Sequence, residues 1–232
     1  MTRREVARAT IPATIAGTEV GALSTSLDAR WLMAYAAALG LDDTRYYDTL
    51  APAGPVAHPL FSVCYEWPAV VALRAKTVRE AWVLLGVHAT HHVIIHRPPT
   101  ADDRLLTRAQ IVKIRPSRAG VPIAAHAAHV YSECARIWNP IHTDVAVART
   151  AGLTAPILHG SATLALAVSQ VIQHDLDGDP ARVREIAARF TGLVFMPSTF
   201  TVRGRGRVGD LFAFEAVDER GELVLSDGVI RA

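Results

Sequence analysis

The segment from Pro156 to Gln173, PILHGSATLALAVSQVIQ, constrains the fold more than any other part of the sequence. Apolar residues cover nearly every side of the helix it predicts, and such a helix is buried on all sides rather than laid on a surface. A layer of strands must therefore cover it. The segment predicts an α+β fold in which a curved antiparallel sheet wraps one long central helix.

Strands are expected from this helix to the end of the sequence. They are separated by turn residues at Pro197, at Gly209-Asp210 and at a hairpin turn over Glu219 to Glu222. This series of short strands, joined by tight turns, is typical of an antiparallel sheet.

The first half shows the same order of elements. A helix is expected from Ala29, capped by Asp28, and a mostly apolar helix over residues 60–75 is expected to kink or restart at Pro68. Strands follow over residues 83–96 and 105–115. We therefore expect two copies of one unit, a degenerate copy over 1–125 and a second over 126–232, related by pattern and not by identity.

Composition argues against a nucleic-acid-binding protein and against a membrane-spanning one. Half of the 232 residues are apolar and a fifth are charged, with a net charge of +2 and both signs interspersed. No basic patch points to nucleic acid, and no apolar run reaches the roughly 18 residues that span a bilayer. The N-terminal residues lack the continuous apolar core of a signal peptide. Two cysteines, Cys64 and Cys134, make no disulfide framework, so we expect a cytoplasmic protein.

The stretch from Trp138 to Gly160, WNPIHTDVAVARTAGLTAPILHG, contains the candidate chemistry. Asn139-Pro140 predicts a turn, which can present His142 as a base. His159-Gly160 opens the central helix, and glycine there lets a ligand approach the N–H groups of the helix start. The stretch thus offers a base at one end and an oxyanion site at the other.

NPIHTD followed by GLTAPILHG resembles the MaoC-like dehydratases, also called R-specific enoyl-CoA hydratases, which have a hot-dog fold. The resemblance is sharp from Tyr131 to Ser169. Over the first half it is architectural only, so the whole chain resembles a double hot-dog protein. It implies addition of water to a 2-enoyl-CoA thioester, or the reverse dehydration, with an acyl-CoA substrate and no cofactor.

The resemblance also implies roles for matching residues. His142 would act as general base or acid, the Gly160 N–H would donate to the thioester oxygen, and Asn139 would shape the turn and hold the water. Around them, further residues are candidates for contact with the substrate: Arg136, Trp138, Asp144, His159 and Ser161. Arg136 could bind a substrate carboxylate or a CoA phosphate. For His159 a structural role is the more common one.

One position departs from the family pattern. The family has an Asp two residues before the motif's Asn, and this chain has Ile137. Glu133 or Asp144 could replace the carboxylate, or His142 could act alone. Otherwise the domain would bind acyl thioesters without converting them. The alternatives to a hydratase are accordingly a hot-dog thioesterase and a catalytically silent acyl-CoA-binding or partner subunit.

Three further expectations concern the rest of the chain. Strand alternation would place His88, His92 and His96 on one face and His91 on the other, too far apart to share a metal, so no metal site is expected. Between Gly120 and Tyr131 there are too few residues to end one sheet and begin another. Hot-dog units bury their surfaces by pairing, which two copies in one chain could supply internally as a monomer; a homodimer of double hot-dogs or a partner subunit fits the pattern equally well, and one of these two is expected.

Overall fold

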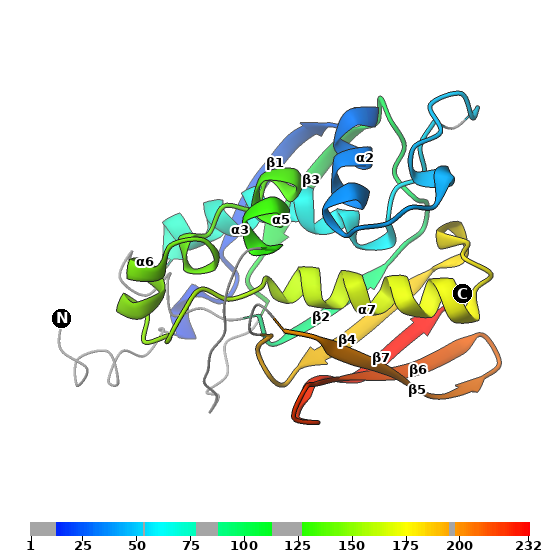
Figure 1. Cartoon of the computed structure of the whole chain (residues 1–232). Coiled ribbons are helices and arrows are strands. Elements are labelled where there is room, and N and C mark those ends of the chain that lie inside the picture. Colours follow the sequence, from blue (N-terminus) through cyan, green and yellow to red (C-terminus); the bar gives the residue numbers. More distant parts are fainter. Residues whose placement is uncertain (1–12, 53, 78–87, 113–126, 195–197) are drawn as a thin grey trace.

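The computed structural model describes residues 13–52, 54–77, 88–112, 127–194 and 198–232. At its centre the helix α7 (Gly160–Asp175) lies across one face of a five-stranded antiparallel sheet (Figure 1). The strands follow the spatial order β2, β4, β7, β6, β5, with these bounds: β2 (Thr90–Ile94), β4 (Glu185–Phe190), β5 (Phe200–Val208), β6 (Leu211–Asp218) and β7 (Leu223–Arg231). The expected hot-dog arrangement, a sheet around a long central helix, is confirmed.

The central helix begins at Gly160 and not at Pro156, where the apolar run starts. The residues before it are held by a neighbouring turn instead of by helical hydrogen bonds. The Ile157 N–H donates to the Ile141 carbonyl at 3.2 Å, and the Ile157 carbonyl accepts from Nδ1 of His142 at 2.6 Å. These bonds keep the chain extended up to His159, and Leu164, Ala165 and Val168 of the helix that follows are fully buried, among others.

A second, smaller layer lies on the other side of α7 (Figure 1). The strands β1 (Glu19–Ser26) and β3 (Arg104–Gln110) pair antiparallel, and α3 (Ser62–Thr77) contacts both of them. Helix α2 (Ala29–Ala38) packs against α5 (Ala127–Ala135). The remaining elements are short: η1 (Ala13–Ile15), η2 (Thr44–Tyr46), η3 (Pro59–Phe61), η4 (Pro140–His142), α6 (Val145–Thr150) and η5 (Pro180–Arg182).

Local signals in the sequence place several elements correctly. The Asp28 carboxylate accepts from the Trp31 N–H at 2.8 Å and caps α2, as expected. The hairpin between β6 and β7 is closed by the Asp218 N–H, which donates to the Glu222 carbonyl at 2.9 Å. The restart expected as one alternative at Pro68 is wrong, because α3 is one helix across it, and the kink stays a prediction.

Other expectations fall partly outside the described residues. These include the first residues of the strand expected over 83–96 and most of the stretch between Gly120 and Tyr131. The strand expected over 105–115 ends earlier, at Gln110 of β3, and residues 113–115 lie outside the described residues. Strand β2 joins the sheet by pairing with β4 from the second half. The division of the chain at residue 125 stays a prediction.

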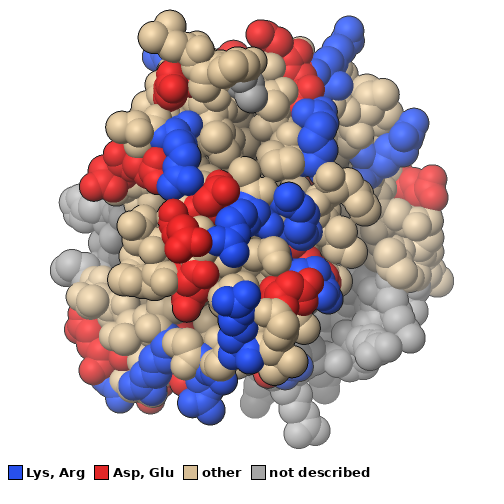
Figure 2. Space-filling view, turned by 90° about the vertical axis from the view of Figure 1, so that its right-hand side faces the viewer, with Lys and Arg blue, Asp and Glu red and all other residues tan. Residues whose placement is uncertain are grey.

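Charge is distributed over the surface in small pairs of opposite sign. Figure 2 shows basic and acidic residues interspersed over one face of the molecule, as the sequence predicts. Arg231 illustrates this: its guanidinium contacts both Glu185, at 3.0 Å, and Asp210, at 3.2 Å. In the part of the chain that the structure describes, no helix is long and apolar enough to cross a lipid bilayer.

His58 links stability to pH. It is 2% exposed, its Nδ1 accepts from the Leu60 N–H at 3.1 Å, and its Nε2 lies 3.1 Å from Oγ of Ser169. Because the Ser169 hydroxyl donates to the Ala165 carbonyl at 2.8 Å, Nε2 of His58 is the donor in that contact. Protonation of Nδ1 would therefore break the Leu60 hydrogen bond, and burial lowers the pKa of His58 from 6.5 to about 3.

We expect a pH-dependent loss of stability that depends on His58. The unfolded state gains a proton first as pH falls, so this contribution is present above about pH 6.5 and is lost towards the folded-state pKa. His58→Asn keeps an acceptor for the Leu60 N–H and does not titrate. Between pH 7 and pH 5 its unfolding free energy should fall by about 2 kcal/mol less than that of the wild type. Urea unfolding at both pH values measures the difference, and parallel losses would contradict it.

Candidate active site

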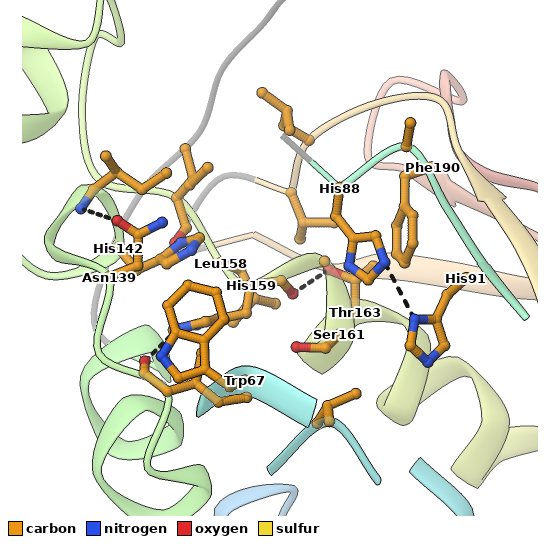
Figure 3. A pocket seen from close by; sticks show the side chains of 18 of the residues that line it. Trp67, His88, His91, Asn139, His142, Leu158, His159, Ser161, Thr163 and Phe190 are labelled. Carbon is orange, nitrogen blue, oxygen red and sulfur yellow. Dashed lines mark hydrogen bonds between the residues drawn. The ribbon is translucent and has the colours of Figure 1, made fainter. Parts of the chain in front are cut away.

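A cavity of about 380 Å³ lies where α3, the start of α7 and the strands β2 and β4 meet. Figure 3 shows Asn139 and His142 on one side of it and His88, His91 and Phe190 on the other, with His159 and Ser161 between them. Its volume falls in the range of small-molecule sites. The lining is largely apolar, with imidazoles as its main polar groups.

His142 lies on the turn η4, which Asn139 begins as its N-cap. The Asn139 side chain accepts from the Ile141 N–H at 3.5 Å, so it shapes the turn, and it also lines the cavity. Nδ1 of His142 lies 2.6 Å from the Ile157 carbonyl. A carbonyl only accepts, so Nδ1 carries the proton and Nε2 keeps a lone pair.

Burial decides the charge of His142. The residue is 8% exposed, and desolvation lowers its pKa to about 4, although the hydrogen bond to the Ile157 carbonyl acts in the opposite direction. The imidazole is therefore neutral at pH 7. It can accept a proton through Nε2, but its low pKa makes it a weak base without a neighbouring anion.

The ring of His159 stacks on that of His142, with centroids 3.7 Å apart. Nε2 of His159 lies 3.2 Å from the Ile137 carbonyl, so it is the protonated nitrogen. Nδ1 is buried and has no hydrogen-bond partner among the described residues. Burial, and then the neighbouring His142, lower the pKa of His159 well below its ordinary value, so this cavity-lining ring is also neutral.

The start of α7 forms the part of the cavity wall between the two histidine groups. Its N-cap residue His159 makes no side-chain cap hydrogen bond, so it leaves the N–H groups of the first turn uncapped. Gly160 and Ser161 both line the cavity at this positive end of the helix dipole. The Ser161 hydroxyl accepts from the Tyr131 hydroxyl at 3.2 Å, which ties the helix start to α5.

Gly160 is packed closely, and a side chain there should be costly. A Cβ atom at this position would lie 3.2 Å from the Phe190 ring and 3.6 Å from Cβ of His88. We expect Gly160→Ala to displace the ring and to lower the unfolding free energy by about 1–3 kcal/mol. The matched control is Gly21→Ala in β1, where a Cβ meets nothing within 4 Å. Urea unfolding of both variants tests this, and equal losses would contradict it.

Three candidates from the sequence are not among the described residues that line the cavity. The Arg136 guanidinium stacks on Trp31 at 3.8 Å and lies 3.8 Å from the Asp28 carboxylate. Trp138 is 58% exposed and donates to the Glu133 carboxylate. Asp144 caps α6 by accepting from the Ala146 and Val147 N–H groups. The cavity therefore lends no support to substrate contacts by Arg136, Trp138 and Asp144, which stay predictions.

Ile137 does line the cavity and is 5% exposed. It presents an aliphatic side chain to the cavity at the position of the family's carboxylate. Glu133 and Asp144, the two replacements expected from their closeness in sequence, are occupied elsewhere and do not belong to the described lining.

The described lining does contain a carboxylate that the sequence did not indicate. Glu66 reaches the cavity from α3, and His88 and His91 reach it from the start of β2. The expected alternation of histidines is wrong at His88, because β2 begins only at Thr90 and His88 lies before the strand. His88 therefore contacts His91, while His92 pairs with Glu185 at 2.7 Å outside the cavity.

Comparison with known proteins identifies related sequences. A family model described as the MaoC like domain matches residues 106–211. A probable enoyl-CoA hydratase 2 of Dictyostelium discoideum is 35% identical over 92 residues, which are 39% of this chain and 31% of that protein. The peroxisomal enoyl-CoA hydratase 2 of Arabidopsis thaliana is 42% identical over 62 residues, which are 27% of this chain and 20% of that protein. The matched stretches thus span less than a third of these relatives.

A solved structure extends the likeness to the fold of the whole chain. A MaoC-like dehydratase from Phytophthora capsici superimposes with a TM-score of 0.74 over 96% of this chain and 97% of that one, at 19% identity. At that identity the match shows a shared fold. The family model thus assigns residues 106–211, which include the motif and the central helix, to the MaoC like domain, and the superposition shows the hot-dog fold.

Proposed function

We propose that the protein hydrates a 2-enoyl-CoA thioester to a 3-hydroxyacyl-CoA and catalyses the reverse dehydration. One observation carries the proposal: the imidazole acceptor of His142 and the uncapped start of α7 line the same cavity. Addition of water to a conjugated thioester needs a base for the water and a donor for the negative charge that forms on the carbonyl oxygen. The relatives named as enoyl-CoA hydratases support this substrate class.

In this proposal His142, at one end of the motif, acts on the water, and Gly160, at the other end, acts on the thioester. Nε2 of His142 takes a proton from water, whose oxygen then bonds to C3. The electrons of the C2–C3 double bond move towards the thioester, and the N–H of Gly160 stabilises the resulting enolate oxygen at the positive end of α7. Asn139 fixes the turn that carries His142 and can hold the water. A proton added at C2 completes the reaction.

The apolar side chain of Ile137 in the cavity favours an alternative. Without its family carboxylate, the same site could bind acyl-CoA without converting it, or direct water to the thioester carbonyl as a thioesterase does. Both alternatives keep the Gly160 oxyanion site and differ in where, or whether, water attacks.

Incubation with crotonyl-CoA separates the three activities. We expect the absorbance of the conjugated thioester to fall without release of free thiol, which a thiol reagent detects. Thiol release would instead identify a thioesterase. Unchanged absorbance together with binding in a titration would identify a silent module. Light scattering after gel filtration tests the expected homodimer in the same preparation.

A further inference from the structure

A second group of titratable side chains lies across the cavity from His142 (Figure 3). His88 and His91 come from the start of β2 and Glu66 from α3. Nδ1 of His91 lies 3.2 Å from Nε2 of His88, and Nε2 of His91 lies 4.0 Å from the Glu66 carboxylate. The three residues therefore follow one another along one wall as a carboxylate, an imidazole and a second imidazole, with a hydrogen bond between the two rings.

This group of three side chains lies beside Gly160, where the thioester carbonyl is proposed to bind. The His88 ring packs on Phe190 with centroids 4.7 Å apart, and its Cβ would lie 3.6 Å from a Cβ at Gly160. His88 is thus a neighbour of the residue assigned to the thioester oxygen, and C2 of an enoyl thioester is bonded to that carbonyl carbon.

This group also contains a buried polar atom without a partner. The His91 side chain is 10% exposed, and its Nε2 has no hydrogen-bond partner within the described part of the chain. At 4.0 Å the Glu66 carboxylate attracts a proton on Nε2 but does not form a hydrogen bond to it. Either ring can supply the N–H of the contact between Nδ1 of His91 and Nε2 of His88, so a proton can be held on either side of it.

We propose that His88 and His91, supported by Glu66, form a second proton-transfer site that serves C2 of the substrate and replaces the carboxylate missing at Ile137. The proposal rests on the proposed hydratase function. It assigns His142 to the water oxygen and the histidine pair to carbon. Glu66 is a positioning residue, because it acts on the substrate through His91.

Over one turnover the enzyme releases as many protons as it takes up. In hydration the active form of the pair carries one extra proton, shared between its two rings, and because burial lowers the pKa of both rings this form is a small fraction of the protein at pH 7. His142 accepts a proton from water as oxygen bonds to C3. An N–H bond of the pair then breaks, and the enolate electron pair forms the C2–H bond. The pair is left neutral, while His142 gives its proton to solvent and the pair takes one up. Dehydration runs through the same steps in reverse.

The groups that face the pair determine its pH dependence. Glu66 and Arg74 face it from α3, His92 from β2 itself, and β4 presents the uncharged Phe190. Burial lowers the pKa of both His88 and His91, and Glu66 raises that of His91. Removing the Glu66 charge should therefore move the protonation of the pair to lower pH.

The test compares Glu66→Gln and His91→Asn with His92→Asn, measured as crotonyl-CoA hydration in the full chain. His92 is a matched control, because it forms a similar pair with Glu185 outside the cavity. We expect the two cavity variants to lower kcat by about tenfold with little change in KM, since water can supply the proton less efficiently. In Glu66→Gln the alkaline fall of kcat should also move to lower pH. His92→Asn should keep the wild-type kcat and KM, and because His92 lowers the pKa of His91, its removal should not move the alkaline fall of kcat to lower pH.

Wild-type kcat and pH profile in folded Glu66→Gln would overturn the second proton-transfer site and leave the hydratase function in place. Glu66 is partly exposed, so this variant stays informative if His91→Asn does not fold. An equal loss in His92→Asn would also overturn the proposal, because the effect would then belong to β2 in general. A wild-type protein without hydration would overturn both proposals.

Discussion

His142→Ala is expected to lower crotonyl-CoA hydration by a factor on the order of 10²–10⁴. Nε2 of His142 is the acceptor that the Ile157 hydrogen bond leaves free, and its loss removes the group that takes the proton from water. The loss should appear in kcat more than in KM, because the apolar wall and the start of α7 remain.

The alanine variant also removes the hydrogen bond to the Ile157 carbonyl, so a second variant is needed to separate chemistry from folding. His142→Asn keeps a side-chain donor near that carbonyl and has no basic nitrogen. We expect it to fold more stably than His142→Ala and to be as inactive. Thermal unfolding and initial rates of both variants provide the comparison. Hydration at the wild-type rate in either variant would refute the assignment of His142.

The central helix and its motif could be predicted because their signals are local. A run of apolar residues on all sides of one helix requires burial, and the structure buries α7. The Asn139-Pro140 turn and the His159-Gly160 pair are also local signals. The sequence therefore indicated the turn that carries His142 and the glycine at the helix start, and both line the same cavity.

Residues brought to the cavity by tertiary packing could not be predicted in this way. Glu66 lies 25 positions before His91 in the sequence, and only the packing of α3 beside β2 brings them together. The carboxylates nearest to the motif in sequence are those of Glu133 and Asp144, and their local partners hold them elsewhere. Arg136 was a plausible anion site by its position, but it stacks on Trp31, which is distant in sequence. The histidines between His88 and His96 were visible in the sequence, but nothing there linked them to Glu66.

Ile137→Asp is expected to raise the hydration rate by a factor on the order of 10². The substitution restores the carboxylate of the family motif on the cavity wall that also carries His142. A nearby anion stabilises the imidazolium that forms when His142 accepts a proton, and so raises its pKa from about 4. A stronger base should speed proton removal from water, and the new carboxyl group is also an acid that can take over the proton transfer to C2 assigned to the histidine pair.

The gain should be accompanied by a loss of stability, because the side chain at 137 is 5% exposed and a buried polar group costs about 1–3 kcal/mol. Ile137→Asn is the matched control. It carries a similar polar cost without the charge, so it should lose stability and gain no rate. If Ile137→Asn is accelerated as much as Ile137→Asp, polarity and not charge is responsible, and the explanation through His142 fails.

The two walls of the cavity can then be tested against each other by combining Ile137→Asp with His91→Asn. If the histidine pair replaces the missing carboxylate, Ile137→Asp should raise kcat by a larger factor in the His91→Asn variant than in the wild type. Residues that serve one step are non-additive in this way, whereas independent groups multiply their effects. The four kcat values of the cycle, measured under the same conditions, decide between these outcomes. Simple multiplication would show that Ile137 and His91 act in separate steps, and the pair would then lose its role as the replacement for the carboxylate.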